Sequence, residues 1–249
     1  MNSIASLEPS YVLHGRAYRE SSLLLEVFSR QHGRIGLVAR GARGKKSRWR
    51  NVLQPFRPLL LSWRTRGELG NLTEAEQVAA LPVGGGDAWF CGLYVNELLM
   101  RSLHRFDPHP DLFDAYRHLL QQLASDEAPQ ALLRVFEKQL LEAIGFGMQL
   151  TVEPATGELV HSEGWYRYDP ASGPRRESVG DGPDRGDTRH TQAGMETGKD
   201  KKLVSGAALL ALESGQIEDV HLQELKRMMR RVLRFHLGDK PLVSQSLFK

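Results

Sequence analysis

The chain has 249 residues and carries 33 Lys and Arg against 30 Asp and Glu, a formal net charge of +3. Its 41% hydrophobic and 25% charged residues are typical of a folded globular protein and exclude general disorder. No apolar run approaches the roughly 18 residues of a membrane span, no leader pattern opens the chain, and the single cysteine, Cys91, excludes a disulfide framework and a multi-cysteine metal site. We therefore expect a cytoplasmic protein that does not bind a membrane.

The small net charge conceals an uneven distribution along the chain. Residues 1–70 hold 13 Lys or Arg and four Asp or Glu, a net charge of +9. Residues 82–150 carry a net charge of −4, and the residues from 151 onward are balanced, with 15 basic and 15 acidic side chains. This asymmetry indicates a module that faces a polyanion, joined to a part with another role.

The first 81 residues have the pattern of short strands. Runs of aliphatic, β-branched and aromatic residues are separated by turns that contain glycine, and they lie at 11–14, 22–29, 34–39, 55–63 and 70–78. Five short strands within 80 residues predict a small barrel, closed or partly open.

The hydrophobic period becomes helical after residue 86. Apolar residues recur at helical spacing in 87–103, 112–123 and 129–144, with Asp87 available as an N-cap and Pro129 as a first-turn residue. Gly145 and Gly147 end the third stretch. These residues predict a compact bundle of three helices over 82–150.

The remaining part, 151–249, is mixed. A short strand is expected at 165–168, and the polar, glycine-rich stretch 171–202 is expected to be a mobile loop. Ser205 is a suitable N-cap for a helix over 207–212 that ends at Gly215, and a last helix is expected at 218–237. We expect the helices of this part to pack on the helical domain.

Motifs for enzymatic chemistry are missing from the sequence. There is no HExxH, no GxSxG and no spaced cluster of Cys and His. The stretch Gly41 to Ser47 resembles a phosphate-binding loop, but it has two residues between its glycines where that loop needs four, and Lys46 follows Lys45 where a hydroxyl is needed. We therefore expect neither an enzyme nor a cofactor or metal site.

The most informative segment is 40–50, which contains six cations, no acid and one aromatic residue. Cations neutralise backbone phosphates, and an aromatic face can stack on a base, so this pattern favours nucleic-acid binding over the alternative of a solvated loop. Phe56 and Trp63 are better explained as core residues. The candidate nucleic-acid contacts are Arg34, Arg40, Arg43, Lys45, Lys46, Arg48, Trp49, Arg50, Arg64 and Arg66.

Two helices carry further candidates. The helix at 218–237 has a basic face that could contact phosphates or could simply be solvated; its residues are Arg227, Arg230, Arg231 and Arg234. In the third helix of the bundle, Arg134 and Lys138 are spaced i, i+4 beside Phe136. Such a pair flanking an apolar groove would suit an acidic peptide with an aromatic end, although an ordinary helix face has the same pattern.

Several motifs in the same order resemble the RecO family of bacterial recombination mediators. They are Tyr11-Val12-Leu13-His14, Glu20-Ser21-Ser22-Leu23, residues 33–43 with the basic loop, Leu53-Gln54-Pro55-Phe56, residues 92–99, Arg134 with Phe136-Glu137, and residues 233–248. The resemblance covers nearly the whole chain except about 155–202. Each motif is modest by itself, but their order is specific.

The resemblance implies an α+β protein, with a five-stranded OB-fold barrel in 1–81, a helical domain in 82–150 and a small C-terminal part in 151–249. It implies binding of single- and double-stranded DNA, strand annealing, cooperation with RecR, and loading of RecA on DNA coated with single-strand binding protein. The acidic tail of that protein is expected to dock near Arg134, and the protein is expected to be cytoplasmic and associated with the nucleoid. Many relatives hold zinc with four cysteines, which this sequence lacks. The alternative is an OB-fold protein associated with RNA or the ribosome.

Overall fold

The computed structural model describes residues 2–49, 51–79, 86–125, 129–177 and 202–244. By packing, the chain forms two compact units. The first comprises Met1–Ile144 and Pro241–Lys249, and the second comprises Gly145–Lys240. The proposed division into three domains stays a prediction.

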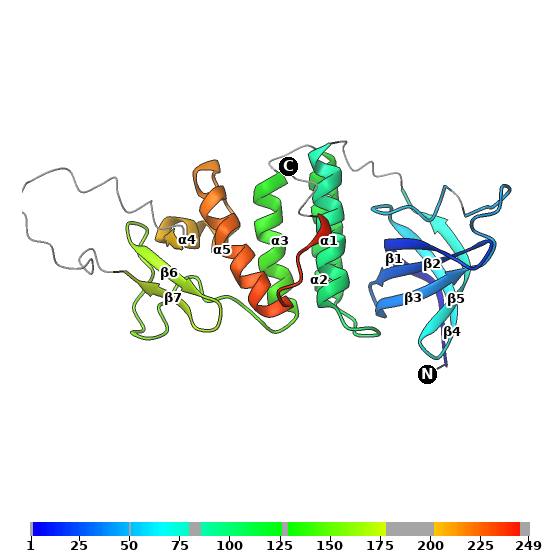
Figure 1. The fold of residues 1–249 in the computed structure, drawn as a ribbon, viewed down its shortest axis with the longest axis horizontal. Helices are drawn as coiled ribbons and strands as arrows, with labels where there is room; N and C mark the ends of the chain where they lie inside the picture. The colour runs from blue at the N-terminus through cyan, green and yellow to red at the C-terminus, as the bar shows by residue number, and fades with distance from the viewer. Residues whose placement is uncertain (1, 50, 80–85, 126–128, 178–201, 245–249) are drawn as a thin grey trace, which may run out of the picture. The chain divides into compact units, whose positions relative to one another are not determined.

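Five strands form a closed barrel at the start of the first unit (Figure 1). They are β1 (Asn2–Tyr18), β2 (Ser22–Ser29), β3 (Gly33–Ala39), β4 (Leu59–Arg66) and β5 (Leu69–Gln77). Around the barrel the order is β1-β2-β3-β5-β4, and every neighbouring pair is antiparallel except β3 and β5. The prediction of a five-stranded barrel followed by helices is confirmed.

Strand β1 is much longer than the strand that was expected at residues 11–14. Its first half pairs with β4 and its second half pairs with β2, so one strand serves two neighbours and closes the barrel. The pairing register shifts between Ala5 and Glu8 and again between Val12 and His14. Such bulges bend a strand, which lets β1 curve from one partner to the other. Polar residues interrupt the apolar pattern of this segment, so the sequence did not predict the full length of β1.

The barrel interior is filled by aliphatic side chains and two tryptophans. Along β4 the exposed side chains of Arg64 and Arg66 alternate with the buried Trp63 and Thr65, as the two-residue period of a strand requires. The core residues are Ala5, Val12, Leu25, Val27, Ile35, Leu37, Ala39, Ala42, Trp49, Leu53, Leu59, Leu61, Trp63 and Leu72.

Three helices follow in the same unit: α1 (Asp87–Ser102), α2 (Pro110–Ala124) and α3 (Pro129–Ala143), which lie side by side in Figure 1. Their positions match the expected ones, although Gly86 and not Asp87 occupies the N-cap of α1. Asp87 lies in the first turn of α1, where its negative charge interacts favourably with the positive end of the helix dipole.

The outer face of β1 and β2 packs on these helices. Rings of Tyr11 and Phe113 lie 5.4 Å apart between centroids, and those of Tyr11 and Tyr116 lie 5.1 Å apart. Buried Asn96 on α1 donates to the carbonyl oxygen of Leu13 at 2.9 Å and accepts from the Tyr116 hydroxyl at 2.6 Å. Both faces of β2 are therefore covered, which explains why it reads as a nearly continuous apolar run.

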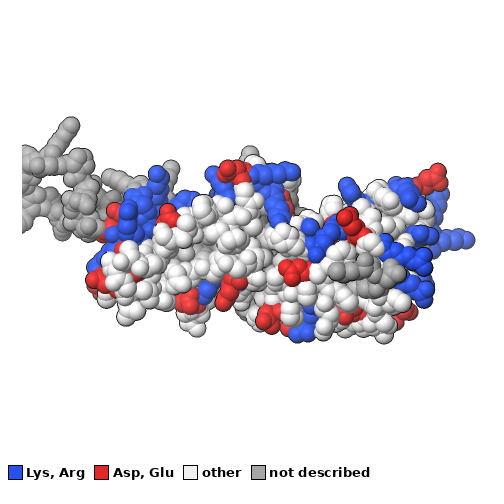
Figure 2. All heavy atoms as spheres, turned by 90° about the horizontal axis from the view of Figure 1, so that it is seen from below, with Lys and Arg blue, Asp and Glu red and all other residues white. Residues whose placement is uncertain are grey.

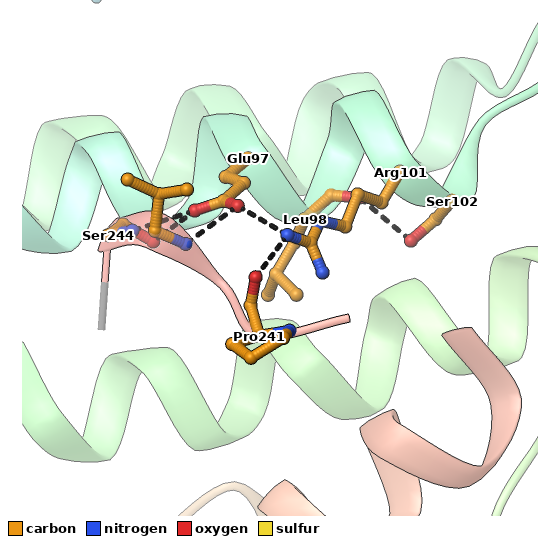
Figure 3. A network of polar contacts seen from close by, with 7 residues as sticks. Glu97, Leu98, Arg101, Ser102, Pro241 and Ser244 are labelled. Atoms are coloured by element: carbon orange, nitrogen blue, oxygen red, sulfur yellow. Dashed lines mark hydrogen bonds and ion pairs between the residues drawn. The ribbon is translucent and has the colours of Figure 1, made fainter. Parts of the chain in front are cut away.

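The C-terminal segment Pro241–Ser244 also belongs to the first unit and lies along α1 (Figure 3). The Glu97 carboxylate accepts hydrogen bonds from the Val243 amide at 2.9 Å and from the Ser244 amide and hydroxyl at 2.9 and 2.6 Å. Arg101 pairs with Glu97 at 2.8 Å and donates to the Pro241 carbonyl oxygen. Burial alone would raise the pKa of Glu97, but these hydrogen bonds and the Arg101 charge lower it below its ordinary value.

The second unit contains a three-stranded sheet and two helices. The sheet order is β7-β6-β8, with β6 (Trp165–Asp169), β7 (Gly173–Arg176) and β8 (Leu203–Ser205), followed by α4 (Gly206–Ser214) and α5 (Asp219–Leu237). The expectation of a loop starting at residue 171 is wrong for β7, which pairs with β6. The rest of that stretch, 178–201, lies outside the described residues. Ser205 caps α4 as predicted by accepting from the Ala208 amide.

Candidate nucleic-acid interface

The connection between β3 and β4 is anchored to the barrel by apolar side chains. Ala42, Trp49 and Leu53 are 3%, 8% and 8% exposed and belong to the barrel core. Gly41 adopts φ 69°, a left-handed conformation that a side chain would strain, and turns the chain out of β3. While Ala42 and Trp49 face inward, the cations between them, Arg43, Lys45, Lys46 and Arg48, are exposed.

Arg43 secures the connection to the β1–β2 turn. Its amide donates to the Ser21 carbonyl oxygen at 2.8 Å, and its Nη1 lies 3.3 Å from the carbonyl oxygens of both Arg19 and Glu20. Arg43 is exposed, but its side chain holds two neighbouring loops together. Arg43 therefore shapes this connection as well as contributing a positive charge to it.

The other cations of this region are presented to solvent. Arg40, Lys45, Lys46 and Arg48 are exposed on the connection, and Arg64 and Arg66 are exposed on β4. Figure 2 shows Lys and Arg side chains gathered on the barrel, at the right of the view. We call the set Arg40, Arg43, Lys45, Lys46, Arg48, Arg64 and Arg66 the basic surface of the barrel.

Acidic residues of β5 lie away from the cations of β4. In the β4–β5 ladder, Arg64 lies opposite Asn71, whereas Glu74 and Glu76 lie opposite Ser62 and Leu60, further along the strand pair. Arg64 and Arg66 are therefore at one end of this ladder and Glu74 and Glu76 at the other, while exposed Glu68 lies in the β4–β5 turn next to the cations. This separation keeps Glu74 and Glu76 away from a polyanion that approaches Arg64.

An open groove of about 440 Å³ adjoins the basic surface. It lies between the β1–β2 turn, the end of β3 and the start of β5. Its lining residues are Tyr18, Arg19, Ser21, Ser22, Val38, Arg40, Gly41, Leu69, Gly70 and Asn71. Among them only Arg40 was a sequence candidate. The adjacency of Tyr18 and Arg19 at a turn between predicted strands was the signal that could have identified the groove.

Two of the residues predicted to contact nucleic acid, Trp49 and Arg34, instead pack against or bond to other parts of the protein. Trp49 is buried in the barrel core, and the Arg48 guanidinium lies over its ring at 4.2 Å, so the expected open stacking face is wrong. Arg34 is half-buried and donates to the Met100 carbonyl oxygen near the end of α1, and burial lowers its pKa. Arg50 lies outside the described residues. Phe56 and Trp63, each 1% exposed, are core residues as predicted.

The basic face on α5 is mostly presented to solvent. Arg227, Arg230 and Arg234 are exposed at i, i+3 and i+7, which places them on one face of the helix. Arg231 is half-buried and donates to the Lys202 carbonyl oxygen at 3.1 Å. The arrangement could contact a second stretch of phosphates, and its role stays a prediction.

The candidate tail site on α3 is largely enclosed. Arg134 is 4% exposed and pairs with Glu137 at 2.7 Å, and Glu137 also accepts from the Tyr94 hydroxyl at 2.6 Å. Phe136 is 1% exposed, and Lys138 is half-exposed. Of the three predicted residues, Lys138 is therefore the one whose side chain reaches solvent.

Within the described ranges, no group of three or more His, Cys, Asp or Glu side chains is arranged to hold a metal ion. No helix among those residues is long and apolar enough to cross a membrane.

Comparisons with known proteins agree along the whole chain. Residues 4–81 match the family model "Recombination protein O N terminal", and residues 85–246 match "Recombination protein O C terminal". A DNA repair protein RecO from Methylococcus capsulatus is 43% identical over 244 residues, covering 98% of this chain and 93% of the relative. DNA repair proteins RecO from Nitrosococcus oceani and Alkalilimnicola ehrlichii are 42% and 44% identical, with 98% of this chain and 92% and 90% of the relatives covered.

Proposed function

The chain belongs to the RecO family of DNA repair proteins, and we propose that it is a recombination mediator that binds DNA through the basic surface of its barrel. In this proposal it binds single- and double-stranded DNA, anneals complementary strands and, together with RecR, helps load RecA onto DNA coated with single-strand binding protein. The observation that carries the proposal is the outward presentation of the cations on a closed five-stranded barrel.

The physical basis is neutralisation of phosphate charge. Lys and Arg side chains release condensed counterions from the DNA backbone, which supplies affinity without reading sequence. The same neutralisation lowers the repulsion between two strands, so complementary strands can be brought together without a chemical step. The proposed role therefore requires no catalytic group and no cofactor.

We also propose that α3 receives the acidic tail of single-strand binding protein. The support is the family resemblance together with the position of Lys138, which reaches solvent beside the buried pair of Arg134 and Glu137. In this arrangement Lys138 makes the first contact with the tail, and Arg134 and Phe136 shape the helix face behind it. A location in the cytoplasm, associated with the nucleoid, follows from the same role.

An annealing assay tests the proposal. Two complementary oligonucleotides, one carrying a fluorophore and the other a quencher, are mixed with the protein, with and without bound single-strand binding protein. We expect faster annealing in both cases, and DNA should compete at least as well as RNA of the same sequence. Annealing no faster than without protein, or a strong preference for RNA, would overturn the proposal in favour of an RNA-associated protein.

A further inference from the structure

The groove beside the basic surface has the features of a base-binding site. Resting on the proposed function, we propose that it holds an unpaired base of single-stranded DNA. The base stacks against Tyr18, and Arg19 and Arg40 contact the phosphates on either side. The buried Trp49, which the sequence favoured for stacking, has no part in this site.

The groove exists because β3 and β5 pair over a short distance only. Their parallel ladder joins Gly36 to Leu69, Leu37 to Gly70 and Val38 to Asn71, and β3 ends one residue later. Gly70 allows this close approach, because a Cβ there would lie 2.7 Å from the Leu37 side chain. Beyond Val38 the chain turns away at Gly41, which leaves the hollow open. Its volume of about 440 Å³ lies within the range of small-molecule sites.

The surface that would meet the base is a ring next to a planar cation. Tyr18 is half-buried at the end of β1, and the Arg19 guanidinium lies over its ring, with the guanidinium carbon 5.3 Å from the ring centroid. In the proposed complex Arg19 moves off this face toward a phosphate, and the base takes its place on the ring. Aromatic rings and guanidinium planes are the two kinds of side chain on which unstacked bases are held. Leu69 and Asn71 complete the lining with an apolar and an amide contact.

The turn that carries this pair is already held in place. Arg19 adopts φ 53°, an unusual conformation for a residue with a side chain, and the hydrogen bonds from Arg43 to Arg19, Glu20 and Ser21 secure it. A turn whose backbone is ordered before binding avoids the entropy cost of ordering it on contact.

The electrostatics select an anionic ligand. None of the described residues that line the groove is Asp or Glu, while Arg19 and Arg40 do line it. Glu20 and Glu68 lie on the adjoining turns but not in the lining. A base inside a duplex is stacked and paired, so it could enter only by being flipped out of the stack, which costs free energy. The groove therefore favours single strands over duplexes.

The test compares Tyr18→Leu with Tyr18→Phe on the full chain. Binding is measured with an oligothymidylate and with a blunt duplex of the same length. We expect Tyr18→Leu to weaken single-strand binding about tenfold and duplex binding less than about twofold, because only the stacked base is lost. Tyr18→Phe keeps the ring and should bind both like the unaltered protein.

A second measurement uses the unaltered protein and so does not depend on a variant that folds. A 2-aminopurine in the oligonucleotide should lose fluorescence on binding as it stacks on Tyr18; unchanged fluorescence at every position would overturn the inference. Equal losses on single strand and duplex for Tyr18→Leu, or no loss on either, would do the same. If the unaltered protein bound neither DNA, the proposed function itself would fail.

Discussion

Neutralising Lys45 and Lys46 together is the sharpest perturbation of the basic surface. Both side chains are exposed, and within the described residues neither has a hydrogen bond or ion pair to another side chain, so Lys45→Ala with Lys46→Ala should leave the barrel intact. Arg43 is a poorer choice because it bonds to the carbonyl oxygens of Arg19 and Glu20.

The expected loss follows from counterion release. If each lysine neutralises one phosphate of a single strand, the slope of log K against log salt falls by roughly 1.4 for the double variant. If the variant and the unaltered protein bind equally at a 1 M reference, this slope change over one decade of salt gives roughly a 25-fold lower affinity for the variant at 0.1 M. On a duplex the slope change is roughly 1.8, so the loss is larger there, about 60-fold.

The assay is a titration of fluorescent oligonucleotides at several salt concentrations. A matched control is Arg175→Ala with Arg176→Ala, which removes two exposed cations from β7 in the second unit. If both pairs lost affinity equally, net charge and not the basic surface would control binding. If the Lys45 and Lys46 variant kept the slope of the unaltered protein, the assignment of these lysines to phosphates would be refuted.

Two further predictions concern the helical part of the first unit. Glu97→Gln should cost about 1–3 kcal/mol of stability and remove hydrogen-exchange protection from the amides of Val243 and Ser244. The folded pKa of Glu97 is lowered, so the stability that its carboxylate contributes is fully present above the unfolded pKa of about 4.3 and is lost as the pH falls through the folded pKa. The unfolding free energies of the unaltered protein and the variant should therefore converge in acid. A difference between them that stays constant with pH would contradict the assignment. Arg134→Ala should cost about 3–5 kcal/mol in chemical denaturation because it leaves Glu137 buried without its cation, whereas Lys138→Ala should change stability by less than about 0.5 kcal/mol. A small effect of Arg134→Ala would show that the pair is not buried in solution.

Local patterns were sufficient to predict most of the secondary structure. The two-residue alternation of β4 and the helical spacing of α1, α2 and α3 arise from the burial of one face of each element, so they are visible in the sequence. The caps at Ser205 and Gly215 depend on local hydrogen bonds and on a left-handed φ, and both were confirmed. The full length of β1 was not visible because it depends on two partner strands that are distant in sequence.

The candidate site could also be predicted from the sequence only in part. A cluster of cations without acids marks a surface for a polyanion, since unpaired charges of one sign stay in solvent, and most of the cluster is exposed in the structure. Composition could not show that Trp49 fills the core or that Arg34 bonds to the end of α1. Both outcomes depend on which side chains meet when the barrel closes and packs on the helices.

The sequence by itself determined the uneven charge, with +9 in residues 1–70, and so indicated which part of the chain to propose as the surface for a polyanion. The tertiary structure alone decided that closure of the barrel buries Trp49 and leaves Tyr18 at the edge of an open groove. Charge is a property of composition and is retained on folding. Exposure of a ring depends on contacts between distant segments, here the β1–β2 turn, the end of β3 and the start of β5.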